Sequence, residues 1–214
     1  MDKIDKLESE KKNIIIGVLA LQGAFREHII AIKKCQAEAI EVRFPEQLQN
    51  TDGLIIPGGE STTIIKLIEK YNFKPKLIEY YNSGKPIFGT CAGLILLAKE
   101  VTGFNFGLGF IDISVTRNSY GRQVDSFEQE IDINLNGKIE KFNAVFIRAP
   151  KIEKVGNSLQ VLAKLNNDIV LAKQNNVLVC AFHPELTDNL RIHKYFLNMV
   201  KNSQNMLKSN INWI

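Results

Sequence analysis

A cysteine between small residues is the first candidate for chemistry in this chain. Cys91 lies at the centre of G-x-C-x-G, with Gly89 and Gly93 on either side, in the stretch "IFGTCAGLILLA". A sharp strand-to-helix turn needs small neighbours, and this pattern is the cysteine counterpart of the nucleophile elbow. Such a turn would hold the sulfur at a helix N-terminus, where the helix dipole favours the reactive thiolate. A small cysteine buried in a tight turn fits the local pattern equally well.

A candidate base and its orienting partner occur in "FHPEL", where Pro184 separates His183 from Glu185. An imidazole can accept the proton of a thiol while a neighbouring carboxylate orients the ring. An ordinary turn, whose backbone the proline fixes, is the alternative interpretation. Functional groups in open α/β sheets gather at the carboxyl ends of the strands. We therefore expect His183 and Cys91 at one edge of a sheet.

A glycine-rich turn in "IIPGGEST" (residues 55–62) supplies a third piece. Two consecutive glycines after a strand permit unusual backbone angles and a close approach to a ligand. Their N–H groups could face a developing oxyanion. The chain has neither G-x-x-x-x-G-K-[ST] nor G-x-G-x-x-G, which argues against a phosphate-binding loop. A plain strand-to-helix turn capped by Ser61 is the remaining alternative.

The other candidate residues favour structural roles. Cys180 could be combined with His183 and Glu185 as a metal site, but its apolar context "VLVCAF" predicts a buried thiol, so no metal is expected. His28 and His193 occur in helical segments among charged residues, and we expect both at the solvated surface. Cys35 is expected to pack on a helix face.

Two arginines end predicted strands. Arg117 and Arg148 each close an apolar-polar alternating stretch. Arginine is ordinarily a surface residue, but its guanidinium can also bind a carboxylate in bidentate fashion. The local sequence leaves both interpretations open.

Elements of two kinds must position these residues. The first half alternates apolar runs, typical of strands buried on both faces, with segments of helical spacing. Strands are expected at 13–21, 39–44, 52–59 and 85–89, and helices at 24–36, 62–71, 76–82 and 92–101. This order predicts an α/β fold with a largely parallel sheet.

The second half changes to short strands, several of which alternate apolar and polar residues as antiparallel strands do. They are expected at 110–117, 127–135, 141–149, 159–165, 168–174 and 177–182, with turns at "NG" (136–137), "NND" (166–168) and "NN" (175–176). A closing helix is expected at about 189–201. We predict one domain over 13–201, a charged disordered extension at 1–12 and a tail at 202–214.

Composition excludes several classes of protein. The chain has 214 residues, of which 45% are hydrophobic and 23% charged, as in ordinary globular domains. The net charge is +4, without an arginine-rich block interleaved with aromatics, so nucleic-acid binding is not expected. No apolar run reaches membrane-spanning length, and the charged start resembles neither a signal nor a transit peptide. Three widely spaced cysteines favour a reducing compartment, and we expect a cytoplasmic protein.

From about residue 14 to residue 200 the chain resembles the glutaminase subunits of pyridoxal 5′-phosphate synthase, a family of class I, triad-type glutamine amidotransferases. The elbow cysteine and His-Pro-Glu are shared by many amidotransferases, whereas "LALQGAFREH", "PGGEST" and "RNSYGRQVDSFE" are specific to this subfamily. The full matching stretches are "IGVLALQGAFREH", "GLIIPGGEST", "GTCAGLILLAKE", "RNSYGRQVDSFE", "FIRAP" and "FHPEL". The resemblance implies a three-layer, flavodoxin-like class I amidotransferase fold.

The resemblance also implies roles for individual residues. Cys91 would be the nucleophile, His183 the base and Glu185 its orienting partner. The backbone N–H groups of Gly59 and Ala92 would form the oxyanion hole. The residues implied to bind glutamine are Gly59, Glu60, Ser61, Arg117, Ile147 and Arg148. Gln22 would lie near the oxyanion hole and the partner interface.

The implied reaction is hydrolysis of L-glutamine to glutamate and ammonia through a cysteine thioester, without a cofactor. The ammonia would pass to a synthase subunit, a (β/α)₈ barrel that builds pyridoxal 5′-phosphate. A glutaminase that serves another synthetase is the main alternative, but it would lack "RNSYGRQVDSFE". A cysteine hydrolase or deglycase of related fold would not need His-Pro-Glu, and a non-catalytic binding module would tolerate loss of the triad.

Overall fold

The computed structural model describes residues 13–117 and 126–211. The predicted extension at 1–12, residues 118–125 of the "RNSYGRQVDSFE" stretch and residues 212–214 lie outside the described residues. Within the described part, no helix is both long enough and apolar enough to cross a membrane.

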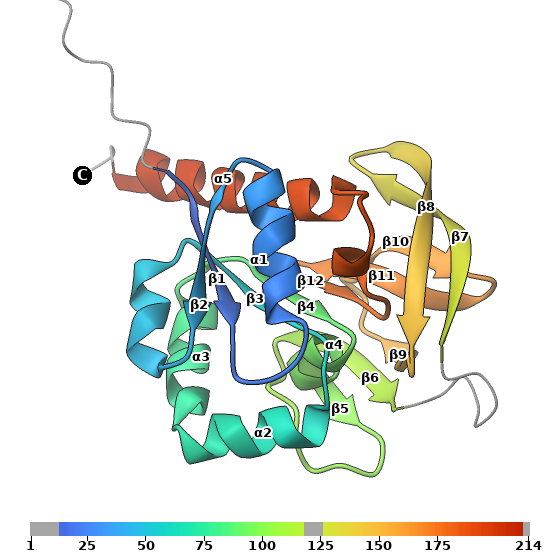
Figure 1. Cartoon of the computed structure of the whole chain (residues 1–214), viewed down its shortest axis with the longest axis horizontal. Helices are drawn as coiled ribbons and strands as arrows, with labels where there is room; N and C mark the ends of the chain where they lie inside the picture. Colours follow the sequence, from blue (N-terminus) through green and yellow to red (C-terminus); the bar gives the residue numbers. More distant parts are fainter. Residues whose placement is uncertain (1–12, 118–125, 212–214) are drawn as a thin grey trace, which may run out of the picture.

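A mixed nine-stranded sheet forms the centre of the described structure, in the order β2-β1-β3-β4-β12-β11-β10-β7-β8 (Figure 1). The parallel part consists of β2 (Glu38–Val42), β1 (Ile15–Leu19), β3 (Gly53–Ile56), β4 (Ile87–Thr90) and β12 (Val177–Cys180). The antiparallel part consists of β11 (Asp168–Gln174), β10 (Gln160–Leu165), β7 (Ser126–Leu135) and β8 (Lys138–Ile147). The predicted α/β class, with a parallel first half and added antiparallel strands, is confirmed.

A second, three-stranded sheet joins β5 (Ala98–Val101), β6 (Ile111–Thr116) and β9 (Lys151–Val155). Here one sequence prediction was wrong, and one strand had not been predicted. The helix expected over 92–101 ends as α4 (Ala92–Leu97), because Ala98 turns to an extended conformation and the chain pairs with β6. The strand β9 was not anticipated, since "KIEKV" shows only one buried position and three exposed ones.

Helices cover the parallel part in two groups. In Figure 1 the blue helix α1 (Phe25–Lys34) and the red helix α5 (Arg191–Ile211) lie together at the top. Below the strands, α2 (Ser61–Lys70) packs against α3 (Phe73–Asn82) and α4. Two 3-10 turns complete the set, η1 (Pro45–Asn50) and η2 (Pro184–Leu186). The closing helix extends to Ile211, so its predicted end near residue 201 was wrong.

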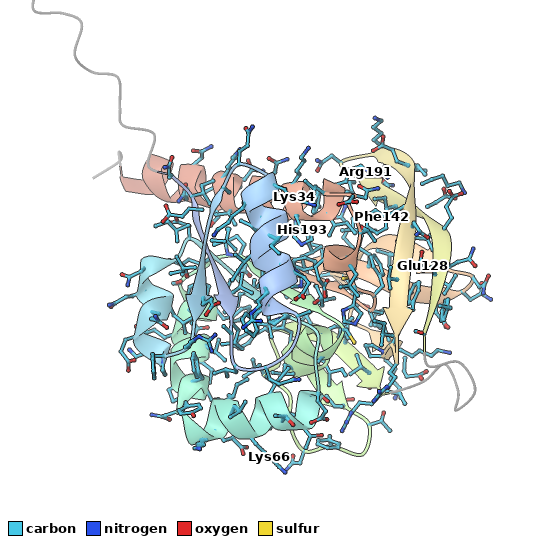
Figure 2. The ribbon with its side chains drawn as sticks, in the orientation of Figure 1. Lys34, Lys66, Glu128, Phe142, Arg191 and His193 are labelled. Atoms are coloured by element: carbon cyan, nitrogen blue, oxygen red, sulfur yellow. The ribbon has the colours of Figure 1, made fainter. Side chains whose placement is uncertain are left out.

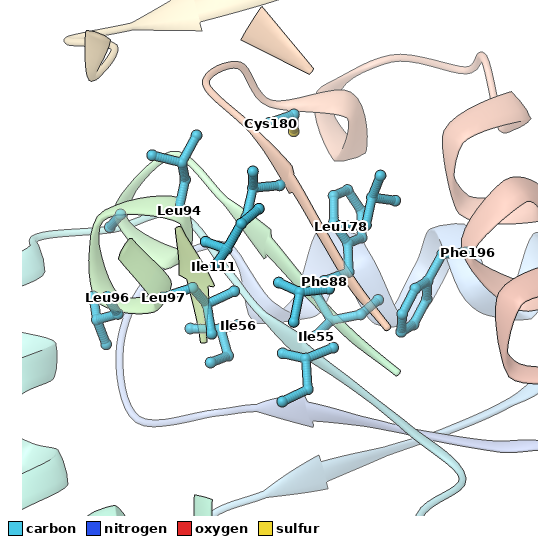
Figure 3. Close-up of a cluster of buried hydrophobic side chains, with 14 of the residues drawn as sticks. Ile55, Ile56, Phe88, Leu94, Leu96, Leu97, Ile111, Leu178, Cys180 and Phe196 are labelled. Atoms are coloured by element: carbon cyan, nitrogen blue, oxygen red, sulfur yellow. The ribbon is translucent and has the colours of Figure 1, made fainter. Parts of the chain in front are cut away.

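Strand β4, which leads to Cys91, is packed on both faces. Phe88 faces the α1–α5 side, where its ring centroid lies 5.6 Å from that of Phe196 on α5 (Figure 3). On the other face, a Cβ atom at Gly89 would lie 2.6 Å from Leu97 of α4. Full burial of a side chain such as Phe88 contributes about 2–3 kcal/mol. The strand that carries the cysteine is therefore fixed from both sides.

The glycines around the cysteine allow α4 to lie directly on the sheet. A Cβ atom at Gly93 would lie 2.0 Å from the carbonyl oxygen of Ile56, the last residue of β3. This clash could not be relieved by moving a flexible side chain, because the obstructing atoms belong to the backbone of Ile56. Gly93 is thus required by close packing of helix on strand, which explains the second glycine of G-x-C-x-G.

The hairpin β7–β8 brings the end of β8 towards the carboxyl edge of the parallel strands. Asn136 and Gly137 both have positive φ, 56° and 81°, as the two-residue turn predicted from "NG" requires. Ten residue pairs fix the register, ending with Ser126 opposite Ile147. The hairpin stands as a yellow ribbon beside the end of α5 in Figure 1, and Figure 2 labels Phe142 and Arg191 where the two meet.

Candidate active site

Cys91 occupies a strained turn between β4 and α4. Its φ of 48° and ψ of −101° are unusual for a residue with a side chain, and such conformations cost about 1–3 kcal/mol. The turn is held by two backbone hydrogen bonds: Cys91 N–H donates to the carbonyl of Cys180 (2.9 Å), and Ile95 N–H donates to the carbonyl of Cys91 (3.3 Å). The structure therefore has the strand-turn-helix form of a nucleophile elbow.

His183 follows β12 and faces this turn. Its backbone N–H donates to the carbonyl of Val145 on β8 (2.8 Å), which fixes the start of the His-Pro-Glu segment. Its Nδ1 lies 2.7 Å from Oε1 of Glu185, and its ring lines the same cavity as Cys91, whose Sγ donates to the carbonyl of Ile147 (3.7 Å). All three side chains are almost fully buried. The arrangement is thiol, imidazole and carboxylate in sequence.

The charges of this group are set by their neighbours. Burial acts to lower the pKa of His183, but the hydrogen bonds with Cys91 and Glu185 outweigh it and raise the pKa to about 10. Burial acts to raise the pKa of Glu185, but nearby His28 and the hydrogen bond with His183 lower it overall. The ring is consequently held as an imidazolium beside a carboxylate, ready to donate a proton towards a bound substrate.

The glycine turn after β3 lies directly against the imidazole. A Cβ atom at Gly58 would lie 2.3 Å from Cε1 of His183. The carbonyl of Gly58 accepts a hydrogen bond from Ala24 N–H (3.0 Å), and Glu60 N–H donates to Oε1 of Gln22 (2.8 Å). The segment after β1 thus holds the glycine turn on its outer side, and Gln22 lies next to Gly59.

One cavity of about 330 Å³ opens at the sulfur. It brings together the predicted site residues except Glu185, which lies behind the imidazole. The residues that line it are Gln22, Gly59, Glu60, Ser61, Cys91, Ala92, Ile95, Arg117, Ile147, Arg148 and His183. Ile95, on the second turn of α4, was not anticipated. The size is suited to a single small metabolite.

Charged groups gather on one wall of this cavity. Glu60 caps α2 by accepting hydrogen bonds from the backbone N–H groups of Thr62 and Thr63. The cap predicted at Ser61 was therefore wrong, because Ser61 is already the first helical residue. The side-chain hydrogen bond from Thr63, with the backbone bonds, lowers the pKa of Glu60 to about 2. Nη2 of Arg117 lies 3.7 Å from Oε1 of Glu60.

The two arginines differ in how they are held. Arg117 stacks over the ring of Phe104, with its guanidinium carbon 4.4 Å from the ring centroid. Arg148 follows β8 with a positive φ of 43°, which turns the chain so that the residue lines the cavity. A carboxylate and two guanidinium groups can together bind the amino and carboxylate groups of a free amino acid.

His28 and His193 are both fully buried, so the expectation of solvated histidines was wrong. They lie where α1 and α5 pack over β4, and Figure 2 labels His193 behind α1. The spacing contained a signal: His28 is four residues before buried Ile32. His193 stands three and four residues before buried Phe196 and Leu197. Each histidine therefore belongs to the apolar stripe of its helix.

The remaining cysteines lie apart from the cavity. Cys180 is buried, its thiol donates to the carbonyl of Phe182 (3.1 Å), and burial raises its pKa well above the usual value. Cys35, half-buried, ends α1. Across residues 13–117 and 126–206, no three histidine, cysteine or acidic side chains gather in a way that could hold a metal ion.

The chain is similar to known glutamine amidotransferases over most of its length. It is 52% identical over 187 residues to a protein of Thermotoga petrophila named pyridoxal 5′-phosphate synthase subunit PdxT, covering 87% of this chain and 99% of the relative. A protein of the same name from Carboxydothermus hydrogenoformans is 56% identical over 186 residues, covering 86% of this chain and 97% of the relative.

A solved structure described as a glutamine amidotransferase is 46% identical and superposes with a TM-score of 0.82, covering 87% of this chain and 98% of that one. The family model of the SNO glutamine amidotransferases matches residues 18–202, a span that runs from β1 into α5 and contains the elbow, the glycine turn and the His-Pro-Glu segment. The chain therefore belongs to the SNO glutamine amidotransferase family.

Proposed function

We propose that this chain is a glutaminase that hydrolyses L-glutamine to L-glutamate and ammonia. The observation that carries the proposal is a buried cysteine in a strained elbow that shares the wall of one cavity of amino-acid size with an imidazole held by a carboxylate. Membership of a glutamine amidotransferase family supports glutamine as the substrate.

In the proposed reaction, the thiolate of Cys91 attacks the side-chain amide carbon of glutamine. The carbonyl oxygen becomes an oxyanion, which the backbone N–H groups of Gly59 and Ala92 would stabilise. His183 donates a proton to the leaving nitrogen, and collapse of the intermediate releases ammonia and leaves a thioester. His183 then accepts a proton from water, which attacks the thioester and releases glutamate.

Glutamine would be recognised by its α-amino and α-carboxylate groups. The carboxylate of Glu60, held ionised by its lowered pKa, is suited to the ammonium group. Arg117 and Arg148 are suited to the carboxylate. Ser61, with Ile147 at the end of β8, would complete the cavity wall around the side chain of the substrate.

The ammonia would be delivered to a synthase subunit that makes pyridoxal 5′-phosphate, as the names of the relatives indicate. Free ammonia is mostly protonated at neutral pH and then cannot act as a nucleophile, so direct transfer between subunits is chemically favoured. We further propose that the partner is a (β/α)₈ barrel and that Gln22 lies near its interface. Relatives of 52–56% identity with one name argue against service to another synthetase.

We propose that residues 13–201 form a single glutaminase domain. The last turns of α5 continue beyond residue 201 to Ile211. We also propose a cytoplasmic location, which the number and wide spacing of the cysteines support.

The test compares wild type, Cys91→Ala and Cys180→Ala, each mixed with the synthase subunit and glutamine. Glutamate release and glutamine-dependent pyridoxal 5′-phosphate formation are measured. We expect both activities in wild type and in Cys180→Ala, because Cys180 lies outside the cavity. Cys91→Ala should lose both, while ammonium salts should restore cofactor formation. Persistent glutamate release in Cys91→Ala would refute the assignment of the nucleophile.

A further inference from the structure

A chain of buried polar side chains continues behind Glu185, away from the cavity. Nε2 of His28 lies 3.3 Å from Oε2 of Glu185 and 3.1 Å from Oγ1 of Thr90. Nδ1 of His28 lies 3.0 Å from Nε2 of His193. His28, Thr90 and His193 are all fully buried. Three polar side chains in a core of this kind are costly unless each has a defined partner.

The positions of the hydrogens follow from the partners. Burial, the largest influence, lowers the pKa of both His28 and His193, which favours the neutral ring with one hydrogen in each. Glu185 is ionised and can only accept. A hydrogen on Nε2 of His28 therefore faces an acceptor, whereas a lone pair there would face the negative carboxylate.

The rest of the chain agrees with this assignment. With its hydrogen on Nε2, His28 accepts from Nε2–H of His193 through Nδ1. Nδ1 of His193, one of two buried side-chain atoms without a hydrogen-bond partner among the described residues, then carries a lone pair. The opposite assignment would leave a buried N–H there without an acceptor, and orphaned buried donors are rarer than orphaned acceptors.

Thr90 connects the same histidine to the glycine turn. Its Oγ1 accepts a hydrogen bond from the backbone N–H of Gly58 (2.9 Å) and lies 3.1 Å from Nε2 of His28. Gly58 and Gly59 share the peptide that would present an N–H to the oxyanion. One imidazole edge thus contacts both the carboxylate behind the base and the residue that holds the oxyanion turn.

We infer that His28 is a positioning residue for the proposed glutaminase reaction: its Nε2–H is hydrogen-bonded to Thr90 and lies against Oε2 of Glu185, so that the base and the oxyanion turn keep one geometry. The inference rests on the proposed function. His28 does not line the cavity, and it acts only through these two residues. Oε2 of Glu185 has no hydrogen-bond donor among the described residues, so the 3.3 Å contact with His28 is its nearest electrostatic support.

The charged and titratable groups around His28 come from three elements. They are Glu27 on its own helix, His183 and Glu185 after β12, and His193 on α5. Thr90 of β4 completes the shell. The contact that holds Glu185 in place therefore depends on the hydrogen at Nε2 of His28. Substitution of His28 can change the position of this hydrogen-bond donor.

Two amide variants of His28 test whether its role depends on a hydrogen-bond donor at the position of Nε2 or only on the volume of the side chain. His28→Gln places an amide N–H near the position of Nε2, and His28→Asn places it near the position of Nδ1. Both are uncharged and polar. We expect His28→Gln to retain kcat for glutamine within about fivefold of wild type. We expect His28→Asn to lose kcat by roughly 10–100-fold, with KM within about threefold because the cavity is untouched.

Stability is measured for both variants, since a structural role alone would lower the melting temperature and leave kcat of the folded protein unchanged. Equal kcat in two folded variants would overturn the inference. If wild type itself releases no glutamate with the synthase subunit present, the proposed function has failed instead, and the kinetics say nothing against the positioning role.

A second measurement locates the hydrogen on the His28 ring in the wild-type protein and does not depend on enzymatic activity. The chain has 3 histidines, so a long-range ¹H–¹⁵N spectrum can assign the ring nitrogens of each. We expect Nε2 of His28 to carry the hydrogen and Nδ1 to resonate as an unprotonated nitrogen. A hydrogen on Nδ1 instead would overturn the inference, whether or not the variants fold.

Discussion

Gly58→Ala should disable the site by adding a single methyl group. The new Cβ would lie 2.3 Å from Cε1 of His183, 2.9 Å from its Nδ1 and 3.3 Å from Cβ of Cys91. Ordinary van der Waals contact begins at 3.4 Å, so the ring or the turn must move by about 1 Å. The ring cannot retreat freely, because Nδ1 is held 2.7 Å from Glu185.

The expected magnitude follows from that displacement. A misplacement of about 1 Å at a catalytic group costs roughly 100-fold in rate, which corresponds to about 3 kcal/mol in the activation barrier. Gly58 does not have a positive φ, so alanine adds no backbone strain of the left-handed kind. The loss should therefore be in kcat, with the melting temperature reduced only modestly.

The assay is glutamate release with the synthase subunit at saturating glutamine, alongside thermal unfolding. Gly84→Ala serves as the matched control: a Cβ there meets nothing within 4 Å, although φ is +77°. It should cost about 1–2 kcal/mol of stability and leave kcat unchanged. Wild-type kcat in Gly58→Ala would show that the turn does not need to touch the imidazole, and the geometric reasoning would be refuted.

Four further outcomes are expected. Cys91→Ala should lower the pKa of His183 from its value of about 10, because the thiol raises it, and an NMR titration of the imidazole measures this. Since that pKa is raised above 6.5, protonated His183 stabilises the fold fully below pH 6.5, and the contribution is lost as the pH rises towards 10. The melting-temperature difference between wild type and His183→Gln should shrink accordingly. Gly23→Ala, whose Cβ would lie 1.9 Å from the Gly58 carbonyl oxygen with φ at +100°, should reduce both melting temperature and kcat. Glu60→Gln should raise KM roughly tenfold or more, with kcat less affected, in initial-rate measurements over a glutamine series.

The sequence predicted the elements near the site better than their ends. Apolar runs and Gly, Pro and Asn signals located β1, β3, β4 and β12 because these strands are buried on both faces and read as continuous hydrophobic segments. The helix after Cys91 was predicted too long, since Ala98 and Val101 fit a helical stripe as well as the buried positions of β5. Pairing with β6, a long-range event, decided between them.

Local pattern also located Cys91, His183 and Glu185, because each belongs to a turn with its own sequence signal. His28 and His193 carry no such signal. Their role depends on α1 and α5 meeting over β4, a contact between segments far apart in the chain. The charged neighbours of each histidine indicated exposure to solvent, whereas the apolar spacing on each helix indicated burial. In the packed structure both histidines are buried.

The strand order has a consequence for when the candidate site assembles during folding. Strand β12 pairs with β4 on one side and β11 on the other, so the imidazole reaches the elbow only when the last strand has entered the sheet. Pairing between segments far apart in the sequence is slow, because closing the long loop between them costs conformational entropy. A partly synthesised or partly folded chain therefore has Cys91 without His183 beside it. Completion of the sheet therefore also completes the contact network in which Cys91 lies.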